Sequence, residues 1–394
     1  MQEPQTRVET RRPAETTALN GDRAALAVDR AIGELRRGRA VAIRESDRAL
    51  VVAAVEAIGS PLLRRLIAAA PGTCLLLTAE RARAGGIAPD ADGPTAVALE
   101  PGTRLETLKA LAGIPETSKR ERLPLQRDRR AYSPHGPRGD DDLVLAAFGL
   151  TKAARLIPAL IGFPTGTVAD ESLHVVSLGA ILEHAAAAAT GIQLVSESRV
   201  PLAGSERSRV ALYRDEHGGS EHVAVIIGEP DLAGSVPLRL HSACLTGDLL
   251  ASLRCDCGEQ LSTAVERIAE LGGGVLLYLD QEGRSIGLAN KLRAYQLQDS
   301  GLDTYDADRH LGFSADERSY DVAAAMLLKL GIGRVRLLTN NPRKIDALRE
   351  HGIDVVDRLP LVASPNAHNE GYLRTKRERA GHLGHGTAAD QDKS

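Results

Sequence analysis

The sequence predicts a mixed α/β protein built from two domains. Its 394 residues are more than a single domain usually contains. The second half alternates short apolar runs with segments of helical periodicity, which is typical of strands joined by helices. Residues 195–201 separate that pattern from an alanine-rich segment, so we expect a hinge between the domains there.

The first half shows a weaker pattern. Residues 1–23 are polar and charged, which is typical of a disordered arm. Residues 116–142 contain charged runs and prolines, and we expect a mobile loop or a partner surface. Apolar spacing and flanking glycines predict, in order, a helix at 29–38, a strand at 40–43, a helix at 50–58, a strand at 73–77 and a helix at 173–190.

The second half carries the clearer elements. Buried strands are expected at 223–227, 237–241, 275–279 and 335–339. Helices are expected at 260–271, 287–299 and 320–330. The run Asn340-Asn341-Pro342 should open a further helix, because proline suits the first helical position. Residues 385–394 are polar and are expected to form a disordered tail.

Bulk composition argues against several classes of function. A net charge of −3 gives no general attraction to nucleic acid, so any anion binding must be local. The chain begins with polar residues and contains no run of about 18 apolar residues, so we expect neither a signal peptide nor a membrane span. Four cysteines, three of them clustered, argue against a disulfide framework and for a reducing, cytoplasmic location.

The cysteine cluster is the strongest chemical signal in the chain. Cys244, Cys255 and Cys257 follow the spacing C-x10-C-x-C. Thiolates this close together are typical zinc ligands, and three protein ligands leave a fourth position for the water of a catalytic site. A structural zinc site completed by a histidine such as His241, and three free thiols, remain as alternatives at this point.

Three further segments carry charged groups beside predicted strands or helices. Gln281-Glu282-Gly283-Arg284 follows a strand and would suit either a polar ligand or a surface turn with a salt bridge. Thr339-Asn340-Asn341-Pro342-Arg343-Lys344 joins a strand to a helix, where free N–H groups and two basic side chains favour phosphate. Asp316-Glu317-Arg318 precedes a helix and by itself indicates capping charges.

Several motifs follow one another along residues 195–384. Besides the cysteines they are His241-Ser242, Leu245-Thr246-Gly247-Asp248, Gln281-Glu282-Gly283-Arg284, Asn290-Lys291-Leu292-Arg293-Ala294-Tyr295, Leu297-Gln298-Asp299, Leu311-Gly312-Phe313, Asp316-Glu317-Arg318 and Leu337-Leu338-Thr339-Asn340-Asn341-Pro342. In this order they resemble GTP cyclohydrolase II. The resemblance implies the fold of that family, a zinc ion, Mg²⁺ on the substrate phosphates and a homodimer. It also implies hydrolysis of GTP to formate, pyrophosphate and 2,5-diamino-6-ribosylamino-4(3H)-pyrimidinone 5′-phosphate, the first step of riboflavin synthesis.

The resemblance also implies a role for each matching residue. The three clustered cysteines would bind zinc, whose water attacks C8 of guanine. Asp316 would be a base and Arg318 a nucleophile at the α-phosphorus, or else a purely electrostatic stabiliser, since arginine stays protonated. Tyr295 would assist ring opening. The GTP site would be lined by Arg239, Leu240, His241, Ser242, Ala243, Gln260, Glu282, Gly283, Arg284, Thr304, Thr339 and Lys344.

Two positions depart from the family pattern. Ala243 stands where glutamate is common, and Asp280 stands where arginine is common. Ala243 removes a contact to guanine or ribose, and Asp280 would repel phosphate if it faced the site. Neither residue is a metal ligand or part of the Asp316–Arg318 pair, so we expect activity, with GTP affinity the property that these changes would alter.

Residues 31–41 are similar to the opening of 3,4-dihydroxy-2-butanone 4-phosphate synthase, which is often fused ahead of the cyclohydrolase. That enzyme depends on an acidic loop after its first strand and on a later Gly-His-Thr-Glu motif. Here residues 44–52 have lost most of the carboxylates, and the second motif is not evident. We therefore expect residues 24–190 to be a degenerate, inactive relative that aids assembly or regulation.

Two other functions remain as alternatives. An inactive cyclohydrolase-like protein would bind GTP or act as an assembly partner, although the retained cysteines, Tyr295, Asp316 and Arg318 argue against it. A zinc-dependent binder of nucleic acid is disfavoured by the net charge and by the absence of Cys-x-x-Cys pairs. The expected partners are therefore GTP and a second copy of the chain, without nucleic acid or membrane.

Overall fold

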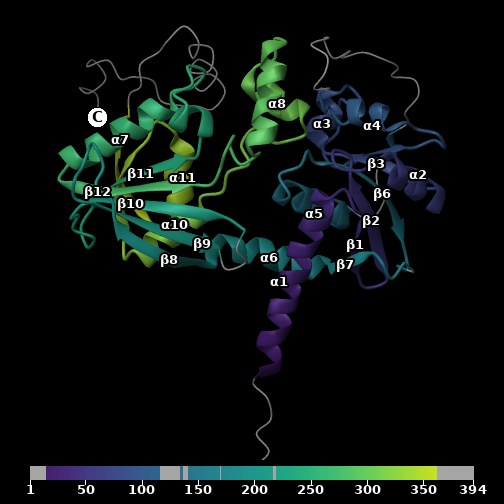
Figure 1. Cartoon of the computed structure of the whole chain (residues 1–394), viewed down its shortest axis with the longest axis horizontal. Helices are drawn as coiled ribbons and strands as arrows, with labels where there is room; N and C mark the ends of the chain where they lie inside the picture. Colours follow the sequence, from purple (N-terminus) through teal and green to yellow (C-terminus); the bar gives the residue numbers. More distant parts are fainter. Residues whose placement is uncertain (1–14, 116–133, 136–140, 169, 216–218, 362–394) are drawn as a thin grey trace, which may run out of the picture.

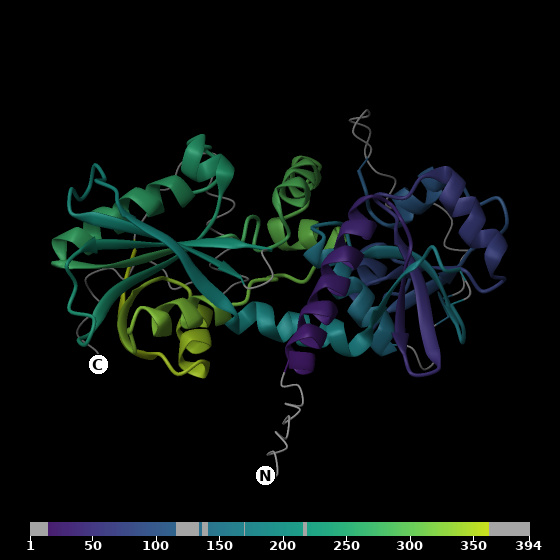
Figure 2. The same ribbon diagram turned by 60° about the horizontal axis from the view of Figure 1, so that its bottom comes forward.

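The computed structural model describes residues 15–115, 134–135, 141–168, 170–215 and 219–361. Two seven-stranded sheets with helices lie side by side in this part of the chain (Figure 1 and Figure 2). The prediction of a mixed α/β fold is confirmed. None of the helices in these ranges has the length and apolarity needed to cross a membrane.

The first sheet is buried on both faces. Its order is β5-β4-β3-β6-β2-β1-β7, with β1 (Val41–Glu45), β2 (Arg48–Ala54), β3 (Cys74–Leu77), β4 (Thr95–Ala98), β5 (Pro134–His135), β6 (Ala159–Thr165) and β7 (His174–Ser177). Helices α1 (Glu15–Arg36), α5 (Asp141–Ala153) and α6 (Leu178–Thr190) cover one face. Helices α2 (Ser60–Ala69) and α4 (Leu105–Leu111) contribute to the core on the other face, and α3 (Ala79–Ala84) lies at the end of β3.

Several predictions for the first half are wrong. The helix predicted at 50–58 is strand β2, which pairs with β1 and β6. An apolar run buried on both faces has no period that separates a strand from a helix. The helix predicted at 173–190 begins at Leu178, because residues 174–177 pair with β1. Helix α1 begins at Glu15, so residues 15–23 are helical and not part of a disordered arm.

The strands predicted at 40–43 and 73–77 are confirmed as β1 and β3, and the helix predicted at 29–38 is the second part of α1. The segment predicted as a break at 116–142 lies mostly outside the described residues, and so does the predicted tail at 385–394.

The second sheet has the order β14-β13-β11-β12-β10-β9-β8. Its strands are β8 (Ile192–Arg199), β9 (Ser208–Asp215), β10 (Glu221–Gly228), β11 (Val236–Ser242), β12 (Gly273–Leu279), β13 (Arg334–Leu338) and β14 (Asp354–Leu359). A π-helical turn η1 (Leu245–Leu249) and helices α7 (Cys257–Glu270), α8 (Leu288–Asp299), α9 (Thr304–His310), α10 (Asp321–Lys329) and α11 (Pro342–Glu350) accompany them.

The strands and helices predicted for this half are confirmed, with bounds that differ by a few residues. The hinge predicted at 195–201 is wrong, because most of it belongs to β8, which pairs antiparallel with β9. Only Gly191 separates α6 from β8. The connection between the two sheets is therefore a helix that runs directly into a strand.

The topology brings three separate segments of the sequence together. Strand β11 pairs in parallel with both β12 and β13. The carboxyl ends of parallel strands meet at one edge of a sheet, where ligand-binding loops gather. Here β11 leads into Cys244, β12 into residues 280–284 and β13 into residues 339–344. The segments that stand out chemically in the sequence thus share one edge.

Candidate active site

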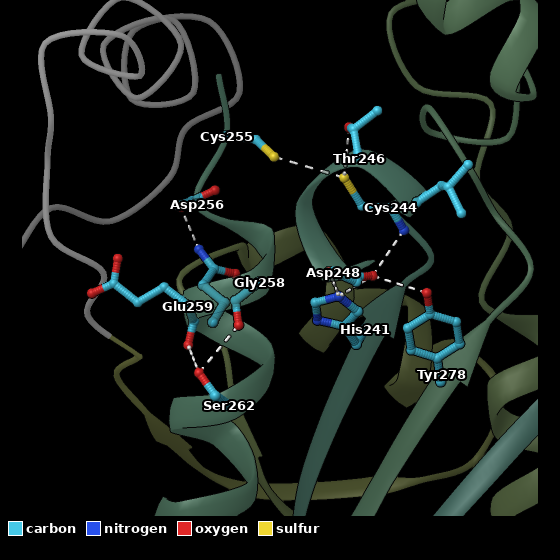
Figure 3. A network of polar contacts seen from close by, with 12 residues as sticks. His241, Cys244, Thr246, Asp248, Cys255, Asp256, Gly258, Glu259, Ser262 and Tyr278 are labelled. Carbon is cyan, nitrogen blue, oxygen red and sulfur yellow. Dashed lines mark hydrogen bonds and ion pairs between the residues drawn. The ribbon is translucent and has the colours of Figure 1, made fainter. Parts of the chain in front are cut away.

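Three thiols gather where the loop after β11 meets the start of α7. Figure 3 shows two of them, Cys244 and Cys255. The Sγ atoms of Cys244, Cys255 and Cys257 lie within 4.8 Å of one another, and those of Cys244 and Cys255 are 3.7 Å apart. A tetrahedron with metal–sulfur bonds of about 2.3 Å has edges of about 3.8 Å, so this spacing fits zinc. Cys257 also begins α7, where the helix dipole favours a thiolate.

His241 does not complete this cluster. Within the described ranges, the group able to hold a metal at this edge consists of the three cysteines. The His241 ring stacks on Tyr278 with centroids 5.5 Å apart, and its Nε2 lies 3.1 Å from Asp248 Oδ1. The alternative of a structural site closed by His241 is therefore not supported. Three protein ligands leave one position open, as in catalytic zinc sites.

Asp248 fixes the loop that carries the first ligand. Its Oδ2 accepts hydrogen bonds from the backbone N–H of Cys244 and from the Tyr278 hydroxyl, both at 2.9 Å. Burial and the neighbouring carboxylate raise the pKa of Tyr278, so its hydroxyl remains a donor. Figure 3 shows the Asp248 carboxylate between His241, Tyr278 and the Cys244 backbone.

Gly247→Ala is expected to lower the affinity for zinc about tenfold, in the range found for residues that support metal ligands, so that the variant is purified with less zinc than the wild type. A Cβ at this position would lie 2.8 Å from Cys255 Sγ and 3.0 Å from Cys244 Sγ, so the thiols would have to move apart. Metal analysis of the purified variant checks this. The control is Gly149→Ala on α5, where an added Cβ meets no atom within 4 Å. Full zinc content in Gly247→Ala would contradict a shared metal.

Lys291, on α8, is a site residue that sequence reasoning did not select. Its Nζ lies 3.1 Å from Cys244 Sγ, 3.0 Å from Thr246 Oγ1 and 2.7 Å from Glu282 Oε1. Burial alone would lower the pKa of Lys291, but Glu282 and Cys244 raise it overall, so the ammonium stays charged. The other Glu282 oxygen accepts a hydrogen bond from the Leu245 N–H at 2.6 Å. The available signal was its place in the motif at 290–295.

Two buried cations lie near the ends of β11 and β13. Arg239 donates hydrogen bonds to the Leu338 carbonyl at 2.9 Å and to Gln260 at 2.6 Å. Lys344 donates to the Leu240 carbonyl at 2.7 Å. Burial lowers the pKa of Arg239 to about 10, which leaves the guanidinium charged at neutral pH. The two side chains form a positively charged region at the edge of the second sheet.

Tyr320, also missed from the sequence, lies beside this region. Arg318 Cζ is 5.7 Å and Lys344 Nζ is 5.8 Å from its ring centroid. Its buried hydroxyl and the Nε of Arg239 lack hydrogen-bond partners within the described part of the chain. Burial raises the pKa of Tyr320 to about 12, so the hydroxyl is a donor. Unpaired buried donors are rare, and they suit an anionic ligand such as a phosphate. Thr339, which is 1% exposed, follows β13 at the same edge.

Asp316 and Arg318 form a two-point ion pair. Arg318 Nε donates to one Asp316 oxygen at 2.8 Å, and Nη2 donates to the other at 2.7 Å. Burial alone would raise the pKa of Asp316, but Arg318 lowers it overall. The carboxylate therefore pairs with a cation, and the interpretation of these residues as capping charges for the next helix is wrong.

The loops after β11 and β12 are tied together. The Ser242 hydroxyl donates to Gln281 Oε1 at 3.0 Å, and the Ala243 N–H donates to the Leu279 carbonyl at 2.8 Å. Gly283 has a φ of +64°, and an added Cβ would lie 3.1 Å from Lys291 Cβ. Glycine is therefore required where this loop passes α8.

The remaining predicted residues lie on the side of α8 and α9. Tyr295 lies one turn after Lys291 on α8, with Arg254 Cζ 4.6 Å from its ring centroid. Arg284 pairs with Asp308 of α9, and its positive charge also helps to lower the pKa of Asp316. Thr304 is the first residue of α9, the helix that carries Asp308.

Asp280 pairs with residues that were not predicted to bind phosphate. Its carboxylate pairs with Arg155 of the first half, and its backbone N–H donates to His222 Nδ1 at 3.1 Å. The positive charge of Arg155 therefore offsets the negative charge with which Asp280 could repel phosphate.

The second half of the chain matches a known protein family. A family described as GTP cyclohydrolase II matches residues 193–360. The GTP cyclohydrolase-2 of Azospirillum brasilense is 44% identical over 383 residues, which cover 94% of this chain and 97% of that protein. The GTP cyclohydrolase-2 of Shewanella amazonensis is 57% identical over 173 residues, which cover 43% of this chain and 83% of that protein.

A solved two-domain 3,4-dihydroxy-2-butanone 4-phosphate synthase from A. baumannii aligns with 86% of this chain and 99% of its own, at 17% identity and a TM-score of 0.31. A likeness at this level carries no conclusion about fold or function.

Proposed function

The chain belongs to the GTP cyclohydrolase II family, and we propose that it hydrolyses GTP to formate, pyrophosphate and 2,5-diamino-6-ribosylamino-4(3H)-pyrimidinone 5′-phosphate. One observation carries this proposal. A cluster of three thiols with an open fourth position lies at the same sheet edge as the buried cations Arg239 and Lys344. The first group suits attack by water, and the second suits a triphosphate.

Zinc is the metal that the three-thiol cluster fits, and when bound it would supply a water of lowered pKa. Three thiolates give such a centre a formal charge of about −1, which weakens that acidity. Lys291 offsets this charge because its ammonium lies 3.1 Å from Cys244 Sγ. Glu282 holds Lys291 in place through the contact of 2.7 Å between its Oε1 and Lys291 Nζ.

The cationic side of the site would bind the phosphates. Arg239 and Lys344 are buried and fixed by backbone carbonyls, so they are preorganised for an anion. The Tyr320 hydroxyl would donate to a phosphate oxygen. We assign Arg318 an electrostatic role at the α-phosphate, with Asp316 orienting it through both oxygens. Tyr295 would assist ring opening, and Thr339 and Thr304 would contact the nucleotide.

Other assignments extend the proposal. Mg²⁺ would neutralise the remaining phosphate charge, as it does in many nucleotide sites. Residues 195–384 would form the cyclohydrolase domain, residues 24–190 an inactive synthase-like domain, and the chain would act as a cytoplasmic homodimer. In support of inactivity, only Ser46 and Asp47 join β1 to β2, and the flanking Glu45 pairs with Arg48. No acidic loop of ten residues fits in that turn.

The decisive experiment uses the purified full chain, loaded with zinc and incubated with GTP and Mg²⁺. We expect equal amounts of formate and pyrophosphate and a pyrimidine product, all suppressed by a chelator and restored by zinc. GTP binding without formate would instead support the alternative of an inactive cyclohydrolase-like partner. Release of pyrophosphate without formate would mean that the chain cleaves the triphosphate of GTP but does not open the imidazole ring.

Lys291→Met is expected to lower kcat about 10- to 100-fold, the usual effect of losing a group that supports metal ligands. Methionine keeps the length of the side chain but removes the charge beside Cys244 Sγ. Formate release and zinc content should be measured together. Lys329→Met, on the exposed end of α10, is the control. Unchanged kcat with full zinc in Lys291→Met would contradict the charge argument.

A further inference from the structure

The segment before Asp316 packs on the first half of the chain and not on its own sheet. The buried cluster that contains residues of β3, β6 and α4 also contains Ile286, Ala294, Leu297, Ala307, Leu311 and Phe313. Figure 1 shows α8 in the region between the two sheets. The loop at 314–318 therefore emerges from a core that the first half helps to build.

Two buried side chains of the first half hold the chain just ahead of this loop. The Thr78 hydroxyl donates to the Gly312 carbonyl at 2.8 Å. Arg81 donates to the His310 carbonyl at 3.0 Å and to the Leu111 carbonyl at 2.8 Å, and it is 5% exposed. Freeing these buried groups would leave a desolvated guanidinium unpaired, which is costly. The start of the loop is thus fixed to the first half.

The end of α5 contacts both loops of the site. Lys152 Nζ lies 2.8 Å from Glu317 Oε1. Arg155, three residues later, pairs with Asp280, and its carbonyl accepts a hydrogen bond from Asn290 at 3.2 Å. Residues 152–155 of the first half therefore contact two loops of the site. One loop leads to Glu282, and the other carries the Asp316–Arg318 pair.

In the sequence, Glu317 lies between Asp316 and Arg318, which form the ion pair. Its Oε1 also accepts a hydrogen bond from the Ser314 N–H at 2.7 Å, which closes the loop on itself. Burial alone would raise the pKa of Glu317, but Lys152 and Ser314 lower it overall, so the carboxylate is charged at neutral pH. The contact with Lys152 is therefore an ion pair across the two halves.

We infer that Lys152 is a positioning residue: through Glu317 it orients the Asp316–Arg318 pair, and the first half acts as an intramolecular scaffold for the site. The inference rests on the proposed function, and it assigns the first half a role that needs no activity of its own. Misplacing a reacting group by about 1 Å can cost about 100-fold in rate. The effect should therefore appear in kcat more than in KM.

The test is a double-mutant cycle in the full chain with Lys152→Met, Glu317→Gln and both together. We expect each single variant to lose about tenfold in kcat with KM for GTP changed less than about twofold, and the double variant to lose no more than either. Lys152→Arg, which keeps the charge, should restore most of the rate. Losses that multiply, or a Lys152→Met rate equal to that of the control Lys329→Met, would overturn the inference.

Hydrogen exchange gives a readout that does not depend on turnover. Lys152→Met should speed exchange of the amides at 314–318 but not of those around the cysteines, and Lys329→Met should change neither. If the wild-type chain released no formate, the proposed function would be wrong, while the exchange result would still decide whether Lys152 holds the loop. Equal exchange at 314–318 in both variants would refute the scaffold.

Discussion

Cys255→Ser is expected to lose its zinc and at least about 1,000-fold of kcat, because a metal-activated water supplies several kcal/mol of catalysis and each 1.36 kcal/mol is tenfold in rate. A serine hydroxyl does not deprotonate as a thiol does, so the third ligand is lost. Cys255 is half-buried on a loop, and the folded chain should tolerate the change better than it would at the buried Cys244. Zinc content and formate release measure the effect.

The matched control is Cys74→Ser, which removes a thiol outside the cluster. Cys74 lies on β3, and its Sγ is 3.5 Å from the Gly162 carbonyl. Burial raises the pKa of Cys74 to about 11, so this thiol is neutral at neutral pH. We expect full zinc content and near wild-type turnover. A zinc-free Cys255→Ser that still releases formate at the wild-type rate would show that the metal has no catalytic part.

Chelation separates a catalytic zinc from a structural one. The two sheet cores carry the bulk of the buried apolar side chains, and the cysteine loop lies at an edge. The zinc-free chain should therefore keep its circular dichroism while it loses activity, and added zinc should restore turnover. Cooperative unfolding on chelation would mean that the site is structural.

Four neighbouring strands of the second sheet, β10 to β13, and the cluster of three thiols could be predicted because local signals agree there. Short apolar runs bounded by glycine and proline alternate with helical periods, and thiols at the spacing C-x10-C-x-C restrict the chemistry strongly. Parallel strands then bring their carboxyl ends to one edge whatever the loops contain. This is why residues 244, 281–284 and 339–344 could be expected to act together.

The groups that support the site could not be predicted in the same way, because their partners are far away in the sequence. Lys291 contacts Cys244 across 47 residues, and Arg155 contacts Asp280 across 125. Nothing local to Asp280 shows whether it faces substrate or a cation. The prediction for the segment that forms β2 was wrong for another reason. Both faces of this strand are buried, so its apolar run shows no period that distinguishes a strand from a helix.

Arg318→Gln is expected to lower kcat about 1,000-fold, the lower end for an arginine that stabilises a phosphate in the transition state. Glutamine keeps a polar side chain but removes the charge and the two-point contact with Asp316. Zinc content should not change, because Arg318 pairs with Asp316 and is not one of the three thiols that would hold the metal. Arg318→Lys, which keeps the charge without the planar fork, should recover only part of the rate.

A double substitution separates the effect of the charge on catalysis from its effect on the fold. Arg318→Gln leaves the largely buried carboxylate of Asp316 without its cation, whereas Asp316→Asn combined with Arg318→Gln removes both charges. Equal melting temperatures with equal loss of kcat in these two variants would assign the loss to catalysis. The control is Arg334→Gln, since Arg334 forms an exposed pair with Asp354 at 3.2 Å and such pairs contribute little.

The same residue allows a test between the two chemical roles of arginine. A nucleophilic Arg318 would form a phosphorus–nitrogen bond, so label from the α-phosphate would stay on the protein after denaturation in base. An electrostatic Arg318 stays protonated in its pair with Asp316 and leaves the protein unlabelled while pyrophosphate is released. We expect no label, because the ion pair with Asp316 keeps the guanidinium protonated, and a protonated, delocalised guanidinium has no free lone pair with which to attack phosphorus.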